Sequence, residues 1–133
     1  MYTLSIADTS ELVFETLGPL EDRLRGLVSD RLANGESADE FVPLGRVGSC
    51  TVYLAASEDQ PSETAAVHAN EKDRLLYMLD GELEVTFADR HETRIVRTGG
   101  LLSVPARLRH SAHFPRLSFY VSVVDTCPSS DVF

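Results

Sequence analysis

The sequence beyond Ala38 constrains the fold most, because it consists of short β-prone runs separated by turn residues. The runs are CTVYLAA, TAAVHA, RLLYML, ELEVTFA, TRIVR, LLSVP and LSFYVSVV. The main breaks lie at Asp59–Glu63, Asp80-Gly81, Ala88–Glu92 and Gly99-Gly100. None of these breaks has room for a helical crossover, so successive strands must pair in antiparallel fashion. The pattern therefore predicts an all-β sandwich or closed barrel.

The run RLLYMLDGELEVTF is apolar on both of its alternating faces. Leu75, Tyr77 and Leu79 fall on one face, and Leu76 and Met78 fall on the other. A strand that alternates in this way is typical of one buried on both sides. We therefore expect it to face the barrel interior on one side and a second layer or subunit on the other.

An amphipathic helix is predicted before the strands. Between Gly18 and Asn34 the apolar residues recur at helical spacing, with Pro19 at a first-turn position and Gly35 available to end the helix. We expect this helix over about 19–33. Its apolar stripe must be buried on the outside of the barrel, over one mouth, or against a second subunit.

The length of 133 residues favours a single domain. We expect an N-terminal extension over 1–40, the barrel over 41–126 and a loose tail over 127–133.

Charge and hydropathy narrow the possible partners. The formal net charge of -9 repels a phosphate backbone, which argues against nucleic-acid binding. The apolar runs are too short to span a bilayer, and the first residues lack the basic start of a signal peptide. We therefore expect a cytoplasmic protein that binds a small molecule and has no membrane partner.

Two groups of residues, separated by a hairpin, share a characteristic spacing. The first group comprises His68, Asn70, Arg74 and Gly81, and the second comprises Gly99, Pro105 and His110. In this spacing the segment from His68 to His110 resembles the cupins, whose fold is a double-stranded β-helix or jelly-roll barrel. The resemblance implies that fold, and it implies a homodimer because many cupins dimerise.

The chain departs from the cupin pattern at two of the four metal-ligand positions that the resemblance supplies. His68 and His110 keep the family's histidines, whereas Asn70 stands for a histidine and Arg74 for a carboxylate. Asparagine is a weak neutral donor, and a guanidinium would hold a fixed positive charge beside the ion. Zinc and iron sites usually use three or more protein ligands.

Two residues could restore a metal site. A one-residue bulge could turn Asp73 inward in place of Arg74, giving two histidines and one carboxylate. His113 could reach inward if its loop curls. With either residue, His68 and His110 would be metal ligands for a divalent Fe, Zn, Ni or Mn ion.

Without a metal, the same residues predict an acid–base site. Arg74 can hold a carboxylate, enolate or phosphate through its planar fork of donors. His68 and His110 can then act as general acid and base, because imidazole titrates near neutral pH. We expect no cofactor and an isomerase, cyclase or lyase that acts on a small anionic or aromatic metabolite. The predicted substrate-binding residues are Asn70, Arg74, Tyr77 and Met78.

Other interpretations stay open at this point. One is a metal-dependent oxygenase, lyase or cyclase with a reduced two-histidine site. Another is a non-catalytic ligand-binding or structural barrel in which the histidines only pack. Arg74 could equally pair with Glu71, Asp73 or Asp80, and β spacing often places residues such as Tyr77 and Met78 in a core.

Overall fold

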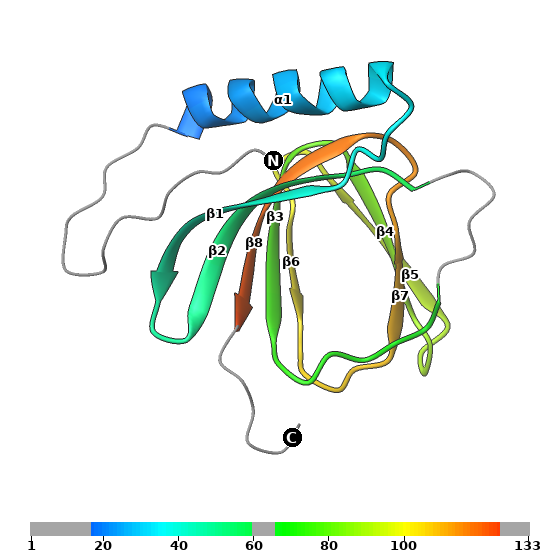
Figure 1. Cartoon of the computed structure of the whole chain (residues 1–133). Helices are drawn as coiled ribbons and strands as arrows, with labels where there is room; N and C mark the ends of the chain where they lie inside the picture. Colours follow the sequence, from blue (N-terminus) through cyan, green and yellow to red (C-terminus); the bar gives the residue numbers. More distant parts are fainter. Residues whose placement is uncertain (1–16, 60–65, 126–133) are drawn as a thin grey trace.

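The computed structural model describes residues 17–59 and 66–125, which form one helix and eight strands (Figure 1). The elements in chain order are α1 (Leu17–Ala33), β1 (Glu40–Val47), β2 (Cys50–Ser57), β3 (Arg74–Asp80), β4 (Glu82–Phe87), β5 (Glu92–Arg97), β6 (Leu101–Val104), β7 (His110–His113) and β8 (Ser118–Asp125). All strand pairings between these elements are antiparallel. The predicted all-β jelly roll with an N-terminal helix is confirmed. In this part of the chain, no helix has the length and apolar character needed to cross a membrane.

The strands form two sheets that face each other across the interior (Figure 1). One sheet has five strands in the order β1-β2-β8-β3-β6, and the other has three in the order β5-β4-β7. The chain around His68 forms an isolated bridge to His110 at the start of β7, so it lies beside the smaller sheet. The run TAAVHA, expected to be a strand, is described only from Ala66 onward, where it forms this single bridge.

Alternation along the five-stranded sheet separates two hydrophobic clusters. The outer cluster joins α1 to the sheet and includes Leu24, Val28, Leu54 and Phe119. The inner cluster fills the space between the sheets and includes Ala55, Met78, Leu83, Val85, Phe87, Val96 and Tyr120. Phe119 and Tyr120 are neighbours on β8, yet they belong to different clusters because successive strand residues point to opposite faces.

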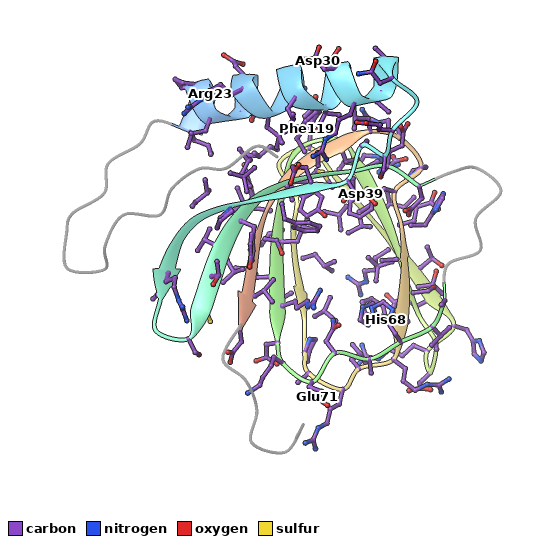
Figure 2. The ribbon with its side chains drawn as sticks, viewed as in Figure 1. Arg23, Asp30, Asp39, His68, Glu71 and Phe119 are labelled. Atoms are coloured by element: carbon purple, nitrogen blue, oxygen red, sulfur yellow. The ribbon has the colours of Figure 1, made fainter. Side chains whose placement is uncertain are left out.

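Helix α1 covers the outside of the sheet at one end of the barrel (Figures 1 and 2). Leu20, Leu24 and Val28 are buried there, which confirms that the apolar stripe packs on the barrel. The stripe is narrower than predicted, because Leu32 is 41% exposed. Figure 2 shows Arg23 on the opposite, solvent side of the helix.

The turn between β3 and β4 requires a glycine. Gly81 has a φ of 143°, and a Cβ at this position would collide with the side chain of Ser118. Ser118 is fully buried, and its Oγ accepts a hydrogen bond of 3.0 Å from the Glu82 amide. The positive φ and the close approach to Ser118 therefore both require glycine at this position.

Candidate functional site

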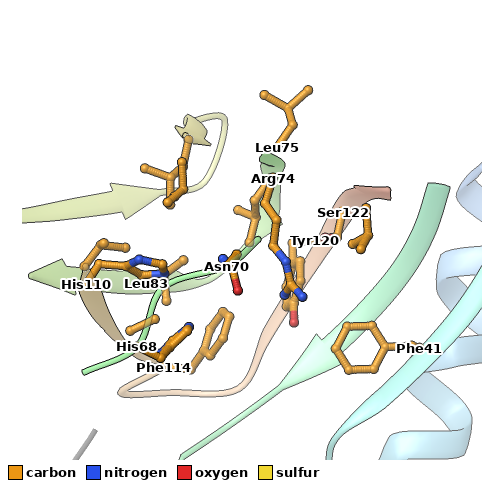
Figure 3. Close-up of a pocket in the computed structure, with 16 residues that line it drawn as sticks. Phe41, His68, Asn70, Arg74, Leu75, Leu83, His110, Phe114, Tyr120 and Ser122 are labelled. Carbon is orange, nitrogen blue, oxygen red and sulfur yellow. The ribbon is translucent and has the colours of Figure 1, made fainter. Parts of the chain in front are cut away.

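A pocket of about 170 Å³ lies between the two sheets, toward the end of the barrel away from α1 (Figures 2 and 3). Its polar lining residues are His68, Asn70, Arg74, His110, Tyr120 and Ser122. Its apolar lining residues are Phe41, Leu75, Leu76, Leu83, Val85, Leu102, Val104, Ala112, Phe114 and Val124. The lining is therefore largely apolar, and of its polar residues His110, Tyr120 and Ser122 are buried whereas His68 and Arg74 are exposed.

The two predicted histidines come together on the wall formed by the smaller sheet. The His68 amide donates to the His110 carbonyl at 2.8 Å, and the His110 amide donates to the His68 carbonyl at 2.9 Å. The ring centroids are 4.5 Å apart, with an angle of 55° between the ring planes. His110 is buried and His68 is exposed. The backbone bridge thus holds one solvent-accessible imidazole against one buried imidazole.

Backbone carbonyl groups orient both rings. Nδ1 of His110 lies 2.8 Å from the Leu108 carbonyl oxygen, and Nδ1 of His68 lies 3.3 Å from the Ala66 carbonyl oxygen. A carbonyl oxygen only accepts, so each Nδ1 is the donor and a neutral ring carries its lone pair on Nε2. Within the described residues neither Nε2 has a hydrogen-bond partner. Both Nε2 atoms are therefore available to a ligand.

Arg74 extends into the pocket from the opposite, five-stranded sheet (Figure 3). It pairs with Val104 of β6 and Val124 of β8, which also line the pocket, so all three side chains share the inner face. None of the described residues forms an ion pair or hydrogen bond with its guanidinium. Asp80, one of its expected partners, instead pairs with Arg25 at 3.1 Å. Arg74 is exposed to solvent although it lines the pocket, so its guanidinium is accessible to a ligand.

Asp73 does not turn inward to restore a metal site, as a bulge in the strand would have allowed. The register of β3 is regular from Arg74 to Met78, and its irregularity lies between Met78 and Asp80. Asp73 does not line the pocket. Its carboxylate accepts a 2.7 Å hydrogen bond from the amide of Ala106, so it orders the loop before β7.

His113 also does not reach inward to restore a metal site. His113 is three residues from His110 on β7, so it points to the opposite face of that strand. Its Nδ1 lies 3.3 Å from Oδ2 of Asp59, outside the pocket lining. No loop curls to bring it inward.

The residues present do not fit the metal site of the resembled family. In the described parts of the chain, no group of three or more His, Cys, Asp or Glu side chains could hold an ion. The pocket supplies two imidazoles, and the guanidinium of Arg74 enters where the family has a carboxylate. The site therefore offers half of a ligand set and a positive charge that opposes a cation.

Two predicted substrate-binding residues, Tyr77 and Met78, lie outside the pocket lining. Asn70 and Arg74 do line the pocket. Tyr77 points to the outer face of the five-stranded sheet and is 43% exposed, and Met78 is buried in the inner cluster. Successive side chains of β3 alternate between the two faces of the sheet, so Tyr77 points outward. Met78 points inward, but it packs within the inner cluster and does not line the pocket.

The prediction missed two polar residues of β8, Tyr120 and Ser122. The Tyr120 hydroxyl lies 2.8 Å from Oγ of Ser57. Burial raises the pKa of Tyr120 to about 12, although the hydrogen bond to Ser57 lowers it. Tyr120 and Ser122 stand at alternate positions with Ser118 in an otherwise apolar run, so the sequence placed them on one face of the strand without fixing which face that is.

Solved structures of similar fold support the architecture. A cupin-2 domain protein from Shewanella frigidimarina matches with a TM-score of 0.55 and 13% identity, over 65% of this chain and 79% of that chain. A cupin superfamily protein from Desulfitobacterium hafniense matches with a TM-score of 0.52 and 19% identity, over 65% and 75% of the two chains. The chain has the cupin fold.

Another match with this cupin fold is a candidate mannose-6-phosphate isomerase from Ralstonia eutropha, with a TM-score of 0.55 and 20% identity over 64% of this chain and 82% of that chain. No protein-family model matches the chain, and no curated protein matches it in sequence. At these identities the likeness establishes the fold and leaves the activity to be argued from the pocket.

Proposed function

We propose that this cupin is an acid–base enzyme that transfers protons on a small carboxylate with an apolar body. The observation that carries the proposal is the Arg74 guanidinium, which enters an apolar pocket opposite two carbonyl-oriented histidines and has no counter-ion among the described residues. The isomerase, cyclase or lyase classes all need these same groups: one anion anchor, one base and one acid.

Arg74 anchors the substrate. Its planar fork can bind both oxygens of a carboxylate, and the apolar walls strengthen that charge-assisted contact. The anchored group is fixed at the wall of the five-stranded sheet. Its apolar body then extends along Leu76, Leu102 and Phe114 toward the histidines.

The two histidines take different roles because their environments differ. His110 is 5% exposed, and its shorter Nδ1 contact of 2.8 Å fixes the ring, which suits a base that removes a proton from carbon. His68 is exposed, so it can exchange protons with solvent and deliver one to an oxygen of the substrate. In an isomerisation, His110 Nε2 takes the carbon-bound proton, and protonated His68 gives a proton to the carbonyl oxygen. The product is an enol with no net change in protonation of substrate plus enzyme.

The proposal is tested with phenylpyruvate, which combines a carboxylate, an aromatic body and an acidic C–H next to a ketone. In D₂O, proton transfer replaces the C3 protons with deuterium, and proton NMR follows the loss of signal above the uncatalysed rate. We expect His110→Gln and His68→Gln each to slow the catalysed exchange by about 100-fold or more. His91→Asn, at an exposed turn outside the pocket lining, is the control and should leave the rate unchanged. Equal exchange by the wild-type protein and both pocket variants would refute acid–base catalysis by this pair.

A further inference from the structure

We propose that Tyr120 is a second anion-binding residue, whose hydroxyl donates a hydrogen bond to the carboxylate held by Arg74 while Ser57 supports it from behind. This inference rests on the proposed function, because it concerns the same pocket and the same ligand. It adds a residue that the cupin motif spacing does not include, since Tyr120 lies on β8, beyond both motif groups.

The ring of Tyr120 is fixed by its neighbours. It stacks on Phe114 with centroids 5.1 Å apart and an angle of 14°, and it meets Phe41 edge-to-face at 6.4 Å and 82°. On the sheet it lies between Met78 of β3 and Ala55 of β2. These contacts, the burial of the residue and the hydrogen bond to Ser57 fix the ring, so its hydroxyl is oriented before a ligand arrives.

The hydrogen bond between Tyr120 and Ser57 can reverse its direction. The phenol O–H is then free to donate to a ligand, and the phenol oxygen still accepts a hydrogen bond from Ser57. The two hydroxyls are 2.8 Å apart, and either can be the donor. In the free protein Tyr120 can donate to Ser57. When a carboxylate is present, Tyr120 can donate to it while Ser57 turns its own proton to the phenol oxygen. The exchange keeps the buried pair hydrogen-bonded in both states.

The phenol is a neutral donor beside a cation. Burial, together with the charges of Asp39 and Asp59, raises the pKa of Tyr120 to about 12, although the hydrogen bond to Ser57 and the charge of Arg74 lower it. The hydroxyl therefore keeps its proton at neutral pH, and it adds a hydrogen bond without a second positive charge that would repel Arg74. Two donors on one wall suit a group with two acceptor oxygens, such as a carboxylate.

The aromatic neighbours of Tyr120 add a second selection. Phe41 is 50% exposed although it lines the pocket, so part of its ring is uncovered in the free protein. A planar apolar group next to the carboxylate would cover that surface. The inferred ligand class is therefore a planar or aromatic carboxylate.

The test compares benzoate with nitrobenzene, which has the same shape but no charge, by NMR titration of the ¹⁵N-labelled protein. We expect Tyr120→Phe to weaken benzoate binding about fivefold and to leave nitrobenzene binding nearly unchanged, because only the charge-assisted hydrogen bond is lost. Arg74→Gln should weaken benzoate binding by more, about tenfold. Amide spectra of each variant confirm that the fold is kept.

Tyr77→Phe is the matched control, since it removes the same hydroxyl from a tyrosine that is 43% exposed on the outer face of β3, outside the pocket lining. We expect it to change benzoate affinity by less than about twofold. If Tyr120→Phe and Tyr77→Phe have the same effect, the Tyr120 hydroxyl makes no contact with the ligand and the inference is overturned. If Arg74→Gln weakens benzoate binding and Tyr120→Phe does not, only the role of Tyr120 is overturned. Both the inference and the anion anchor are overturned if the wild-type protein binds benzoate no more tightly than nitrobenzene. They are also overturned if Arg74→Gln keeps the full preference for benzoate.

Discussion

Two arginines in this molecule have contrasting environments. At the junction of α1 and the sheet, Arg25 contacts Glu21 at 3.0 Å and Asp80 at 3.1 Å, and its guanidinium lies 4.1 Å from the ring centroid of Phe119. In the pocket, Arg74 has no such partner among the described residues. Burial alone would lower the pKa of Arg25, but the hydrogen bonds to Glu21 and Asp80 outweigh it and raise the pKa. Arg25, which joins the helix to the sheet, has counter-ions from its own chain, whereas our proposal assigns the counter-ion of Arg74 to a bound carboxylate.

The largest expected effect comes from converting the unpaired site into the family's metal site. The double change Asn70→His and Arg74→Glu replaces the cation with two ligands and completes a set of three histidines and one carboxylate. We expect elemental analysis to find about one divalent ion per chain in this variant, against much less than one in the wild-type protein. The wild-type protein could instead contain about one ion per chain that His68→Ala and His110→Ala remove. That result would contradict the hypothesis that Arg74 takes the place of a metal ion.

The second effect is on catalysis. Because Arg74 anchors the substrate, Arg74→Gln should slow the exchange of phenylpyruvate protons about 30-fold or more, through loss of the charge-assisted contact. Arg25→Gln removes the same charge from the paired site and should leave the exchange rate within about twofold of wild type. The comparison fails if both variants slow the reaction equally.

Arg25→Gln should destabilise the protein more than Arg74→Gln does, which reverses their order in the exchange assay. Arg25→Gln removes two ion pairs and the contact with Phe119, and we expect it to lower the free energy of unfolding by about 1–2 kcal/mol, a value limited by the partial exposure of the side chain. Arg74→Gln breaks no ion pair or hydrogen bond with the described residues and should change the free energy of unfolding by less than about 0.5 kcal/mol. Urea unfolding of the three proteins measures both values, and a loss in Arg74→Gln as large as in Arg25→Gln would indicate a hidden structural partner.

The last effect, on the pH dependence of stability, concerns Tyr120. Its pKa is raised from 10.0 to about 12 in the folded protein, so its contribution to stability is complete below pH 10 and is lost as the pH rises toward 12. We expect the stability advantage of wild type over Tyr120→Phe to shrink by about 1–2 kcal/mol between pH 8 and pH 11.5. Urea unfolding at the two pH values gives the difference, and a constant advantage would show that the phenol is not protected from ionisation.

The sequence predicted the barrel well because its apolar runs and motif spacing are local signals. It did not indicate β1, where Pro43 and the register shift before Gly45 interrupt the strand pattern. The strand β7 was equally hidden, because HSAH has no apolar run.

The site was predicted only in part, because its contacts join segments that are distant in the sequence. The motif spacing indicated His68, His110, Asn70 and Arg74, and all four line the pocket. Tyr120 could not be assigned from alternation alone. Its face depends on the register of β8 against β3 and β2, which no local pattern fixes.

The most direct test of the central claim is a crystal structure of the protein with bound benzoate. We expect the carboxylate to lie within hydrogen-bonding distance of the Arg74 guanidinium, with the ring in the apolar pocket beside Phe114. A carboxylate directed to solvent, or a guanidinium paired with an acidic residue of its own chain, would contradict the claim that Arg74 has no counter-ion because a ligand supplies it.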